Sequence, residues 1–236
     1  MKQQHEIQLQ ILKKALFADK LRYSDLKPDP DMENNQFDFH LDKLIADGLI
    51  EKKDREYKLT NKGKEYANRM DTDRVNIPHQ GKIGAMICCT KTKNNLTEYL
   101  IYTRLKQPFF GCQGFPTGKI AYGEKVVDGA ERELLEETGL KGKAQVVAIK
   151  HYLVIDKQSD QLVEDKYMYL CLIKNPSGKL TPNDEGKFEW VKEADFKKYI
   201  TNHFESYKNF IDQINLFKNF NGEVKLEEII HKSTKF

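Results

Sequence analysis

Residues 118 to 140 join a glycine-bearing loop to a segment whose pattern favours a two-faced helix. At about 3.6 residues per turn, Glu133, Glu136 and Glu137 fall on one face of that helix. The neighbouring stripe is apolar and consists of Val127, Ala130 and Leu134. The pattern predicts a helix that packs on a sheet with one face and turns its carboxylates toward a cleft with the other.

The acidic face has a cost that a cation would remove. Like charges three or four residues apart destabilise a helix by about 0.2–0.5 kcal/mol per pair and raise each other's pKa. Mg²⁺ prefers carboxylate oxygens and shares its remaining positions with water and substrate phosphates. A solvated face is the alternative interpretation of a glutamate-rich helix. The spacing of the whole segment favours a metal and phosphate site.

The full pattern extends beyond the three glutamates. It consists of Gly118, Glu124, Arg132, Glu133, Leu134, Glu136, Glu137, Gly139 and Leu140 at fixed spacing. This pattern resembles the signature of the Nudix hydrolase family at every position, with Thr117 where many members have glycine. The resemblance implies an α+β protein, an α/β/α sandwich on a mixed sheet, that hydrolyses a nucleoside diphosphate linked to another group.

The resemblance also implies roles for the residues of the signature. Glu133, Glu136, Glu137 and the carbonyl of Gly118 would bind Mg²⁺, with Mn²⁺ as an alternative. Glu124 and Arg132 would orient these ligands, because a guanidinium can fork onto a carboxylate and fix its rotamer. Catalytic roles would fall to Glu136, Glu133, Arg132 and Glu124.

Other candidate site residues lie outside the signature. Glu185 belongs to residues 182–191, which resemble the family's acidic loop, and Asp184, Glu189 and Glu164 are its rivals as general base. The candidate substrate contacts are Arg104, Lys106 and Lys119 for phosphate and Phe110, with Phe109, for a base. Solvated cations and loop packing are the alternatives for these residues.

Residues 1–74 are expected to form a separate domain from residues 75–236. A helix, a short helix, a third helix that Asp31 caps and that ends at Gly48, two strands, and a helix capped by Thr60 resemble a winged helix-turn-helix domain. The candidate DNA contacts are Asn34, Asn35 and Gln36 on the third helix and Lys52, Lys53 and Arg55 in the wing. Residues 1–75 contain 15 basic and 15 acidic residues, so charge does not support DNA binding.

The remaining pattern completes a sheet and a covering helix. Strands are expected at 84–90, 99–102, 144–155 and 166–173, and a helix at 204–217, whereas 224–236 yields no prediction. No apolar run approaches the roughly 20 residues of a membrane span, and the N-terminus lacks a signal-peptide pattern. The four cysteines show no CxxC spacing, which agrees with a cytoplasmic protein that keeps them reduced.

Three functions are open at this point. The leading one is a Mg²⁺-dependent pyrophosphohydrolase that acts on a nucleotide. Residues 155–158 lack the proline and tyrosine typical of relatives that cleave ADP-ribose and dinucleoside polyphosphates, so a nucleoside triphosphate or oxidised nucleotide is the default substrate. The alternatives are a nucleotide-sensing transcriptional regulator that binds DNA as a homodimer, and an enzyme that processes RNA ends.

Overall fold

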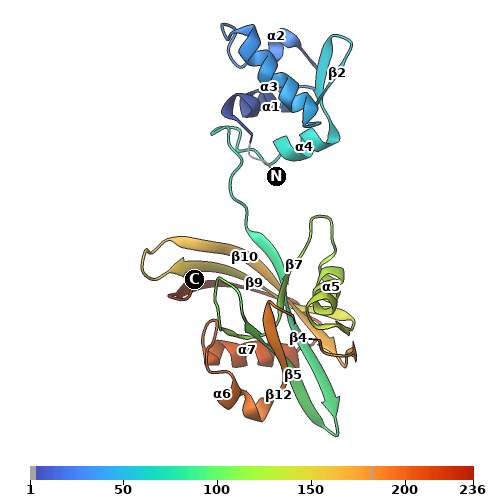
Figure 1. Cartoon of the computed structure of the whole chain (residues 1–236), viewed down its shortest axis with the longest axis vertical. Coiled ribbons are helices and arrows are strands. Elements are labelled where there is room, and N and C mark those ends of the chain that lie inside the picture. The colour runs from blue at the N-terminus through green and yellow to red at the C-terminus, as the bar shows by residue number, and fades with distance from the viewer. Residues whose placement is uncertain (1–3, 182) are drawn as a thin grey trace. The chain divides into compact units, whose positions relative to one another are not determined.

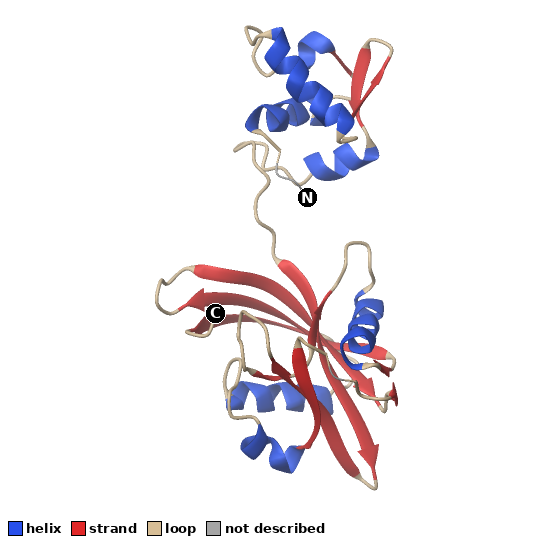
Figure 2. Ribbon diagram, viewed as in Figure 1, coloured by secondary structure: helices blue, strands red, loops and turns tan. Residues whose placement is uncertain are grey.

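The computed structural model describes residues 4–181 and 183–236, so Pro182 of the acidic loop lies outside it. The chain divides into two compact units, residues 1–79 and 80–236, and Figures 1 and 2 show the elements of each. None of the helices in the described ranges is both long and apolar enough to cross a membrane.

The first unit is a small α+β domain. Its elements are α1 (Glu6–Leu16), β1 (Leu21–Arg22), α2 (Tyr23–Leu26), α3 (Asn34–Ala46), β2 (Ile50–Lys53), β3 (Glu56–Leu59) and α4 (Asn61–Ala67). The three short strands form one antiparallel sheet in the order β1-β3-β2. Its core is built from apolar side chains of all four helices and the hairpin, among them Ile11, Leu12, Leu26, Phe37, Leu44, Ile50 and Ala67.

The helix ends of this unit follow local hydrogen bonding. Thr60 caps α4 as expected, because its Oγ1 accepts from the backbone N–H of Gly63 at 3.0 Å. The expected cap at Asp31 is wrong. Asp31 instead donates its N–H to the Asp29 side chain at 2.9 Å in a turn, and α3 begins later, with Glu33 as its N-cap.

The second unit is built on one mixed sheet. Its main strands are β4 (Lys82–Lys93), β5 (Leu96–Arg104), β9 (Ala144–Asp156), β10 (Leu162–Lys174), β12 (Gly186–Lys192) and β13 (Lys225–Ser233). The order is β12-β5-β4-β10-β9-β13, with β4 and β10 parallel, β9 and β13 parallel, and the other neighbours antiparallel. Two short strands, β6 (Gln113–Gly114) and β7 (Thr117–Lys119), add to β5 and β4.

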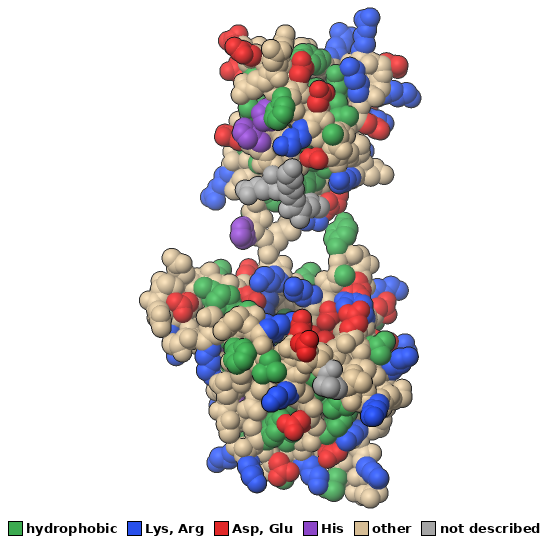
Figure 3. Space-filling view, in the orientation of Figure 1, with side chains coloured by type: hydrophobic (Ala, Val, Ile, Leu, Met, Phe, Trp, Pro, Cys, Tyr) green, Lys and Arg blue, Asp and Glu red, His purple; other side chains and the backbone are tan. Residues whose placement is uncertain are grey.

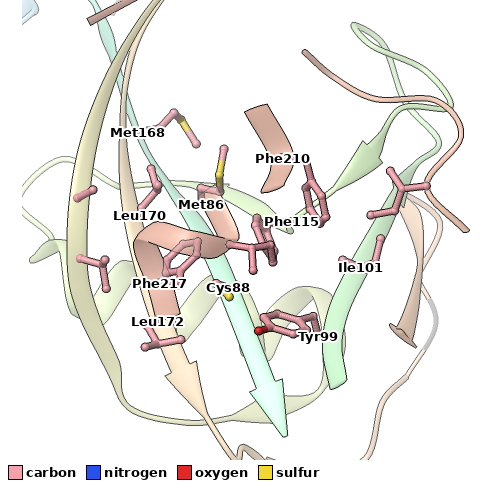
Figure 4. Close-up of a cluster of buried hydrophobic side chains, with 14 of the residues drawn as sticks. Met86, Cys88, Tyr99, Ile101, Phe115, Met168, Leu170, Leu172, Phe210 and Phe217 are labelled. Carbon is pink, nitrogen blue, oxygen red and sulfur yellow. The ribbon is translucent and has the colours of Figure 1, made fainter. Parts of the chain in front are cut away.

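Helices cover both faces of this sheet. The signature helix α5 (Val126–Thr138) packs Ala130 and Leu134 against one face, where Ala85, Ile87 and Cys89 of β4 point. The other face receives α6 (Phe196–Tyr199), which follows the 3₁₀ turn at 193–195, and α7 (Tyr207–Lys218). Figure 4 shows the second core, where Met86 and Cys88 of β4 meet Phe210 and Phe217 of α7. The expected α/β/α sandwich is therefore confirmed.

Several strands of the second unit were not predicted. The C-terminal residues 225–233 form β13, whose neighbour is β9. Directly after α5, β8 (Leu140–Lys141) pairs with β11 (Ser177–Gly178), which follows β10. The edge position of β13 explains why the sequence did not predict this strand. Leu226 and Ile230 remain exposed, so the strand lacks a simple alternation of apolar and polar residues.

Candidate active site

Arg132 is the centre of a hydrogen-bond network on α5. Its Nε and Nη2 donate to the two carboxylate oxygens of Glu124 at 2.7 and 2.8 Å, and its Nη1 donates to Glu133 at 2.9 Å and Glu136 at 2.8 Å. Nη2 also donates to the backbone carbonyl of Lys119 at 3.0 Å. One guanidinium therefore joins the loop before α5 to two of the three glutamates on its acidic face.

Glu124 anchors the loop to the start of α5. Its carboxylate accepts from Arg132 and from the N–H of Ala121 at 2.9 Å, and these hydrogen bonds lower the pKa of Glu124 to about 2. Gly129 makes this approach possible, because a Cβ there would lie 2.7 Å from Ile120 Cδ1 and 2.8 Å from Glu124 Oε2. Glu124 is thus held as a carboxylate in contact with the helix.

Gly118 and Glu133 are packed against each other. A Cβ built on Gly118 would lie 2.2 Å from Glu133 Cγ and 2.4 Å from its Oε2, so any side chain there would displace the glutamate. The Oε1 of Glu133 also accepts from the N–H of Lys119 at 3.2 Å. The loop glycine therefore fixes a carboxylate beside a strand backbone, and the proposed carbonyl ligand and side-chain ligand lie close together.

Glu137 is half-buried on the acidic face, as Glu133 is, whereas Glu136 is exposed. Burial, followed by the charge of neighbouring Glu133, raises the pKa of Glu137 to about 7. Its own backbone carbonyl accepts from the Asn183 side chain at 2.8 Å, and Asn183 Oδ1 accepts from the N–H of Glu185 and Gly186. Asn183, which the sequence did not single out, thus connects the acidic loop to the end of α5.

The same glutamates line a cleft of about 890 Å³ together with basic side chains, which are Lys82, Arg104, Lys106, Lys119 and Lys166. Arg104, Lys106 and Lys119 all lie on this cleft, as expected of phosphate contacts. Acidic and basic side chains lie side by side on this surface of the unit (Figure 3). Arg104 also donates to the backbone carbonyls of Pro108 at 2.5 Å and Gln107 at 3.1 Å, which holds the loop after β5.

Two of the four candidates for a general base, Glu185 and Glu164, line the cleft. Glu185 lines the cleft and forms an ion pair with Lys106, and Glu164 lines it farther along the sheet. Burial, followed by the charge of Arg104, lowers the pKa of Lys106. Glu189 is exposed on β12 and accepts from the Tyr199 hydroxyl, and neither it nor Asp184 lines the cleft. The structure therefore leaves Glu185 and Glu164 as rivals.

Phe110 lies outside the cleft, where it could not stack on a base bound there. Its side chain is 58% exposed and does not line the cleft, whereas Phe109 is buried and does. Phe109 has a backbone φ of 65° and packs edge-on against Phe204, so the turn directs the first phenylalanine inward and the second outward. The prediction for Phe110 is corrected by this turn, which the sequence did not reveal.

The candidate DNA contacts lie on the surface of the first unit. Asn34, Asn35 and Gln36 are exposed in the first turn of α3, and Lys52, Lys53 and Arg55 are exposed on the β2–β3 hairpin. Lys52 Nζ lies 5.3 Å from the centroid of the Tyr57 ring. All six residues are exposed.

The acidic face suits a hard cation by its chemistry. Within residues 4–181 and 183–236, no group of three or more His, Cys, Asp or Glu side chains stands in a ready metal-binding arrangement. Arg132 Nη1 binds one carboxylate oxygen of Glu133 and one of Glu136 and so holds these two side chains near each other. The oxygen-only donor set and the close fit of Gly118 on Glu133 agree with Mg²⁺.

Comparison with known proteins gives a match for each unit. A model of the NUDIX domain matches residues 82–214, and a domain of unknown function, DUF7347, matches residues 4–70. The curated proteins give no match.

Solved structures resemble the second unit in fold. The NUDIX domain of Shewanella oneidensis NrtR in complex with ADP ribose is 14% identical with a TM-score of 0.50, over 68% of this chain and 97% of that one. The MutT protein from Bacillus halodurans is 17% identical with a TM-score of 0.49, over 66% and 93%. The NUDIX model matches more than half of the residues of this chain, and the chain therefore belongs to the NUDIX family of nucleotide pyrophosphohydrolases.

Proposed function

We propose that this protein is a Mg²⁺-dependent hydrolase that cleaves the pyrophosphate linkage of a nucleoside triphosphate or of a nucleoside diphosphate derivative. The observation that carries the proposal is one cleft with opposite charges on its walls. Glu133, Glu136 and Glu137 face it from α5, and Arg104, Lys106 and Lys119 face it from the strands and loops. A metal and a polyphosphate together need such a pairing of charges.

The metal would be held by Glu133, Glu136, Glu137 and the carbonyl of Gly118. When bound there, Mg²⁺ supplies neutralisation of charge on phosphate oxygens and a water of lowered pKa. Arg132 keeps Glu133 and Glu136 together before binding, and Glu124 holds Arg132 in place. The raised pKa of Glu137 is the cost of crowding carboxylates at a half-buried position, and a cation offsets it.

The remaining residues position the substrate and accept a proton. Arg104, Lys106 and Lys119 bind phosphate oxygens, and the backbone contacts of Arg104 limit the orientations of its side chain. Glu185 is the base in this proposal, since the Asn183 turn holds its loop at the C-terminal end of α5.

The test is product release from a nucleotide panel with Mg²⁺, with Mn²⁺ and with EDTA. The panel includes ADP-ribose, the ligand named for the NrtR NUDIX domain. Glu136→Gln should abolish turnover and leave the fold intact. Glu131→Gln is the matched control, because Glu131 lies on the same helix but accepts from Lys143 and the N–H of Ala144. Normal turnover by Glu136→Gln with Mg²⁺ would refute the metal assignment.

A second function is favoured by the first unit. Its element order, with exposed amides at the start of α3 and basic residues on the hairpin, suits a winged helix that binds DNA and could make the protein a nucleotide-responsive regulator. A mobility shift at low and physiological salt tests this role, with Lys52, Lys53 and Arg55 changed together to alanine. Binding that is unchanged by these substitutions would refute the wing contact.

A further inference from the structure

One edge of the sheet in the second unit is formed by β13. The order of the described strands is β12-β5-β4-β10-β9-β13, so β13 has β9 on one side and no described strand on the other. In Figure 1 it is the dark red strand next to β9. Its register with β9 runs from residue 225 to 233 without a bulge, and these residues include no proline. A regular edge of this length is a template for pairing with another strand.

The backbone groups of alternate residues in β13 point away from β9. The carbonyl of Ser233 accepts from the N–H of Lys157, which directly follows β9, at 2.8 Å, so the backbone groups of Ser233 are directed toward β9. Successive residues of a strand direct their N–H and C=O groups to opposite edges. The outer edge of β13 therefore carries the N–H and C=O groups of the even-numbered residues, which are Leu226, Glu228, Ile230 and Lys232.

The same four residues place exposed side chains on one face of the sheet. Leu226 is 63% and Ile230 is 67% exposed, and the side chains of Glu228 and Lys232 are 76% and 55% exposed. Ile229 points to the other face, where it packs against the core under α7. The strand at the opposite edge differs, because the exposed residues of β12 are all charged, namely Lys187, Glu189 and Lys192. Only β13 of the two edge strands thus combines an open edge with exposed apolar side chains.

The residues after β13 leave this edge open. Lys235 donates from Nζ to Asn202 Oδ1 and to the backbone carbonyl of His203, both at 2.7 Å. The carbonyl of Lys235 accepts from the N–H of Phe109 at 3.2 Å. The end of the chain therefore turns toward the loops before α7 and after β5, and it does not run along the outer edge of β13.

Charge restricts how a second copy of β13 can pair with this edge. Antiparallel registers centred on residue 228, 229 or 230 all align the outward-facing residues of two copies. A two-fold axis at Glu228 places two carboxylates opposite each other, which is destabilising. An axis at Ile229 places Glu228 opposite Ile230. An axis at Ile230 places the two Ile230 side chains together and sets Glu228 opposite Lys232 on both sides of the axis, which is the favourable arrangement.

We propose that β13 pairs with β13 of a second copy of this chain, antiparallel about a two-fold axis at Ile230, so that two sheets become one. In this register each aligned pair of outward-facing residues exchanges two backbone hydrogen bonds. Glu228 contacts His151 through Oε1, and its Oε2 can bind Lys232 of the second copy. Lys232 exchanges an exposed ion pair with Asp160 for this contact, and an exposed ion pair contributes little stability.

The experiment is sedimentation velocity of the full chain over a range of protein concentrations. The unmodified protein should form a dimer of about twice 27.6 kDa that dissociates on dilution. Ile230→Lys places two like charges at the axis and should raise the dimer dissociation constant by about 10-fold or more. Leu96→Lys is the matched control, because Leu96 is similarly exposed, at 57%, but begins β5 and lies outside β13.

Reversal of charge tests the register of the two strands. Glu228→Lys sets two lysines opposite each other and Lys232→Glu sets two glutamates opposite each other, so each change alone should weaken the dimer. Both changes together restore opposite charges and should return the dissociation constant to within about threefold of the unmodified value. Thermal unfolding of each variant shows that it folds.

Three results would overturn the proposal. They are a monomer at every concentration, a dimer that Ile230→Lys does not weaken, and a double variant that associates no better than the two single ones. The first result would leave this edge to an extended peptide of another protein. The second would place the interface elsewhere on the chain, and the third would exclude the register centred on Ile230.

Discussion

Gly118→Ala is the sharpest test of how the acidic face is held. The new methyl carbon would lie 2.2 Å from Glu133 Cγ and 2.3 Å from its Cδ, whereas ordinary contacts begin near 3.4 Å. Glu133 must therefore retreat by about 1.2 Å, and its contacts with the Lys119 N–H and with Arg132 are broken or lengthened. A misplacement of about 1 Å in a catalytic constellation costs on the order of 100-fold in rate.

The effect on folding should be much smaller than the effect on activity. Gly118 lies in strand β7, where its φ is not in the left-handed region, so alanine meets no backbone strain. Restricting the unfolded chain contributes about 0.4–1 kcal/mol of stability, which partly offsets the lost hydrogen bonds of about 1.5–3 kcal/mol. We expect kcat/KM to fall by about 100-fold while Tm falls by only a few degrees.

Gly114→Ala is the control for this experiment. Gly114 also lies in a short strand, and a Cβ there has no neighbour within 4 Å among the described residues. Steady-state kinetics and thermal unfolding are measured for both variants with Mg²⁺ in excess. If Gly118→Ala keeps kcat/KM within about threefold of the unmodified protein, the fit of Gly118 on Glu133 does not control the site, and the reasoning fails.

Two further predictions concern Arg132 and His151. Arg132→Lys keeps the charge, but a lysine cannot donate to Glu124, Glu133 and Glu136 together. Activity should therefore fall by about 10- to 100-fold, and the apparent Mg²⁺ affinity should fall with it. Kinetics equal to those of the unmodified protein would show that charge alone is needed. Burial lowers the pKa of His151, but its hydrogen bonds with Glu228 of β13 at 3.2 Å and Asp165 of β10 at 3.0 Å outweigh burial and raise it. The fold favours the protonated imidazole, so protonated His151 contributes up to about 1 kcal/mol to the stability of the folded state. This stability is complete below about pH 6.5 and is lost as the pH rises through the raised pKa of His151. The Tm difference from His151→Gln should shrink between pH 6 and 9, and a difference that grows with pH would contradict this sign.

The sequence was informative where a short segment determines its own geometry. The glutamate spacing and the apolar stripe set the orientation of α5, and Gly139 ends it in the left-handed conformation with a φ of 74°. The strands and α7 follow from their periodicity, although the four predicted strands are longer than expected and α7 begins later, at Tyr207. The positions of Arg104, Lys106 and Lys119 on one cleft were inferred from their proximity to the signature, and the structure brings them together.

The parts that could not be predicted depend on contacts between distant segments. Asn183 acts on α5 only because the acidic loop folds back on its end, and no local pattern marks that contact. Phe109 and Phe110 are chemically equivalent in the sequence, and a single residue with positive φ decides which enters the cleft. The surroundings of Lys166 were not predictable either, because the three rings around it come from three other segments of the chain.

The alternation along β4 has a consequence for the tolerance of this protein to insertions and deletions. Lys82 and Met86 face the cleft side of the sheet, and Ala85 and Ile87 face α5. Because the side-chain period of a strand is two, a single-residue insertion within 83–87 would exchange these two sets and move a charged residue under the signature helix. Length changes in this strand should prevent correct folding. The polar turn at 157–160 between β9 and β10 can vary in length without altering either face of the sheet.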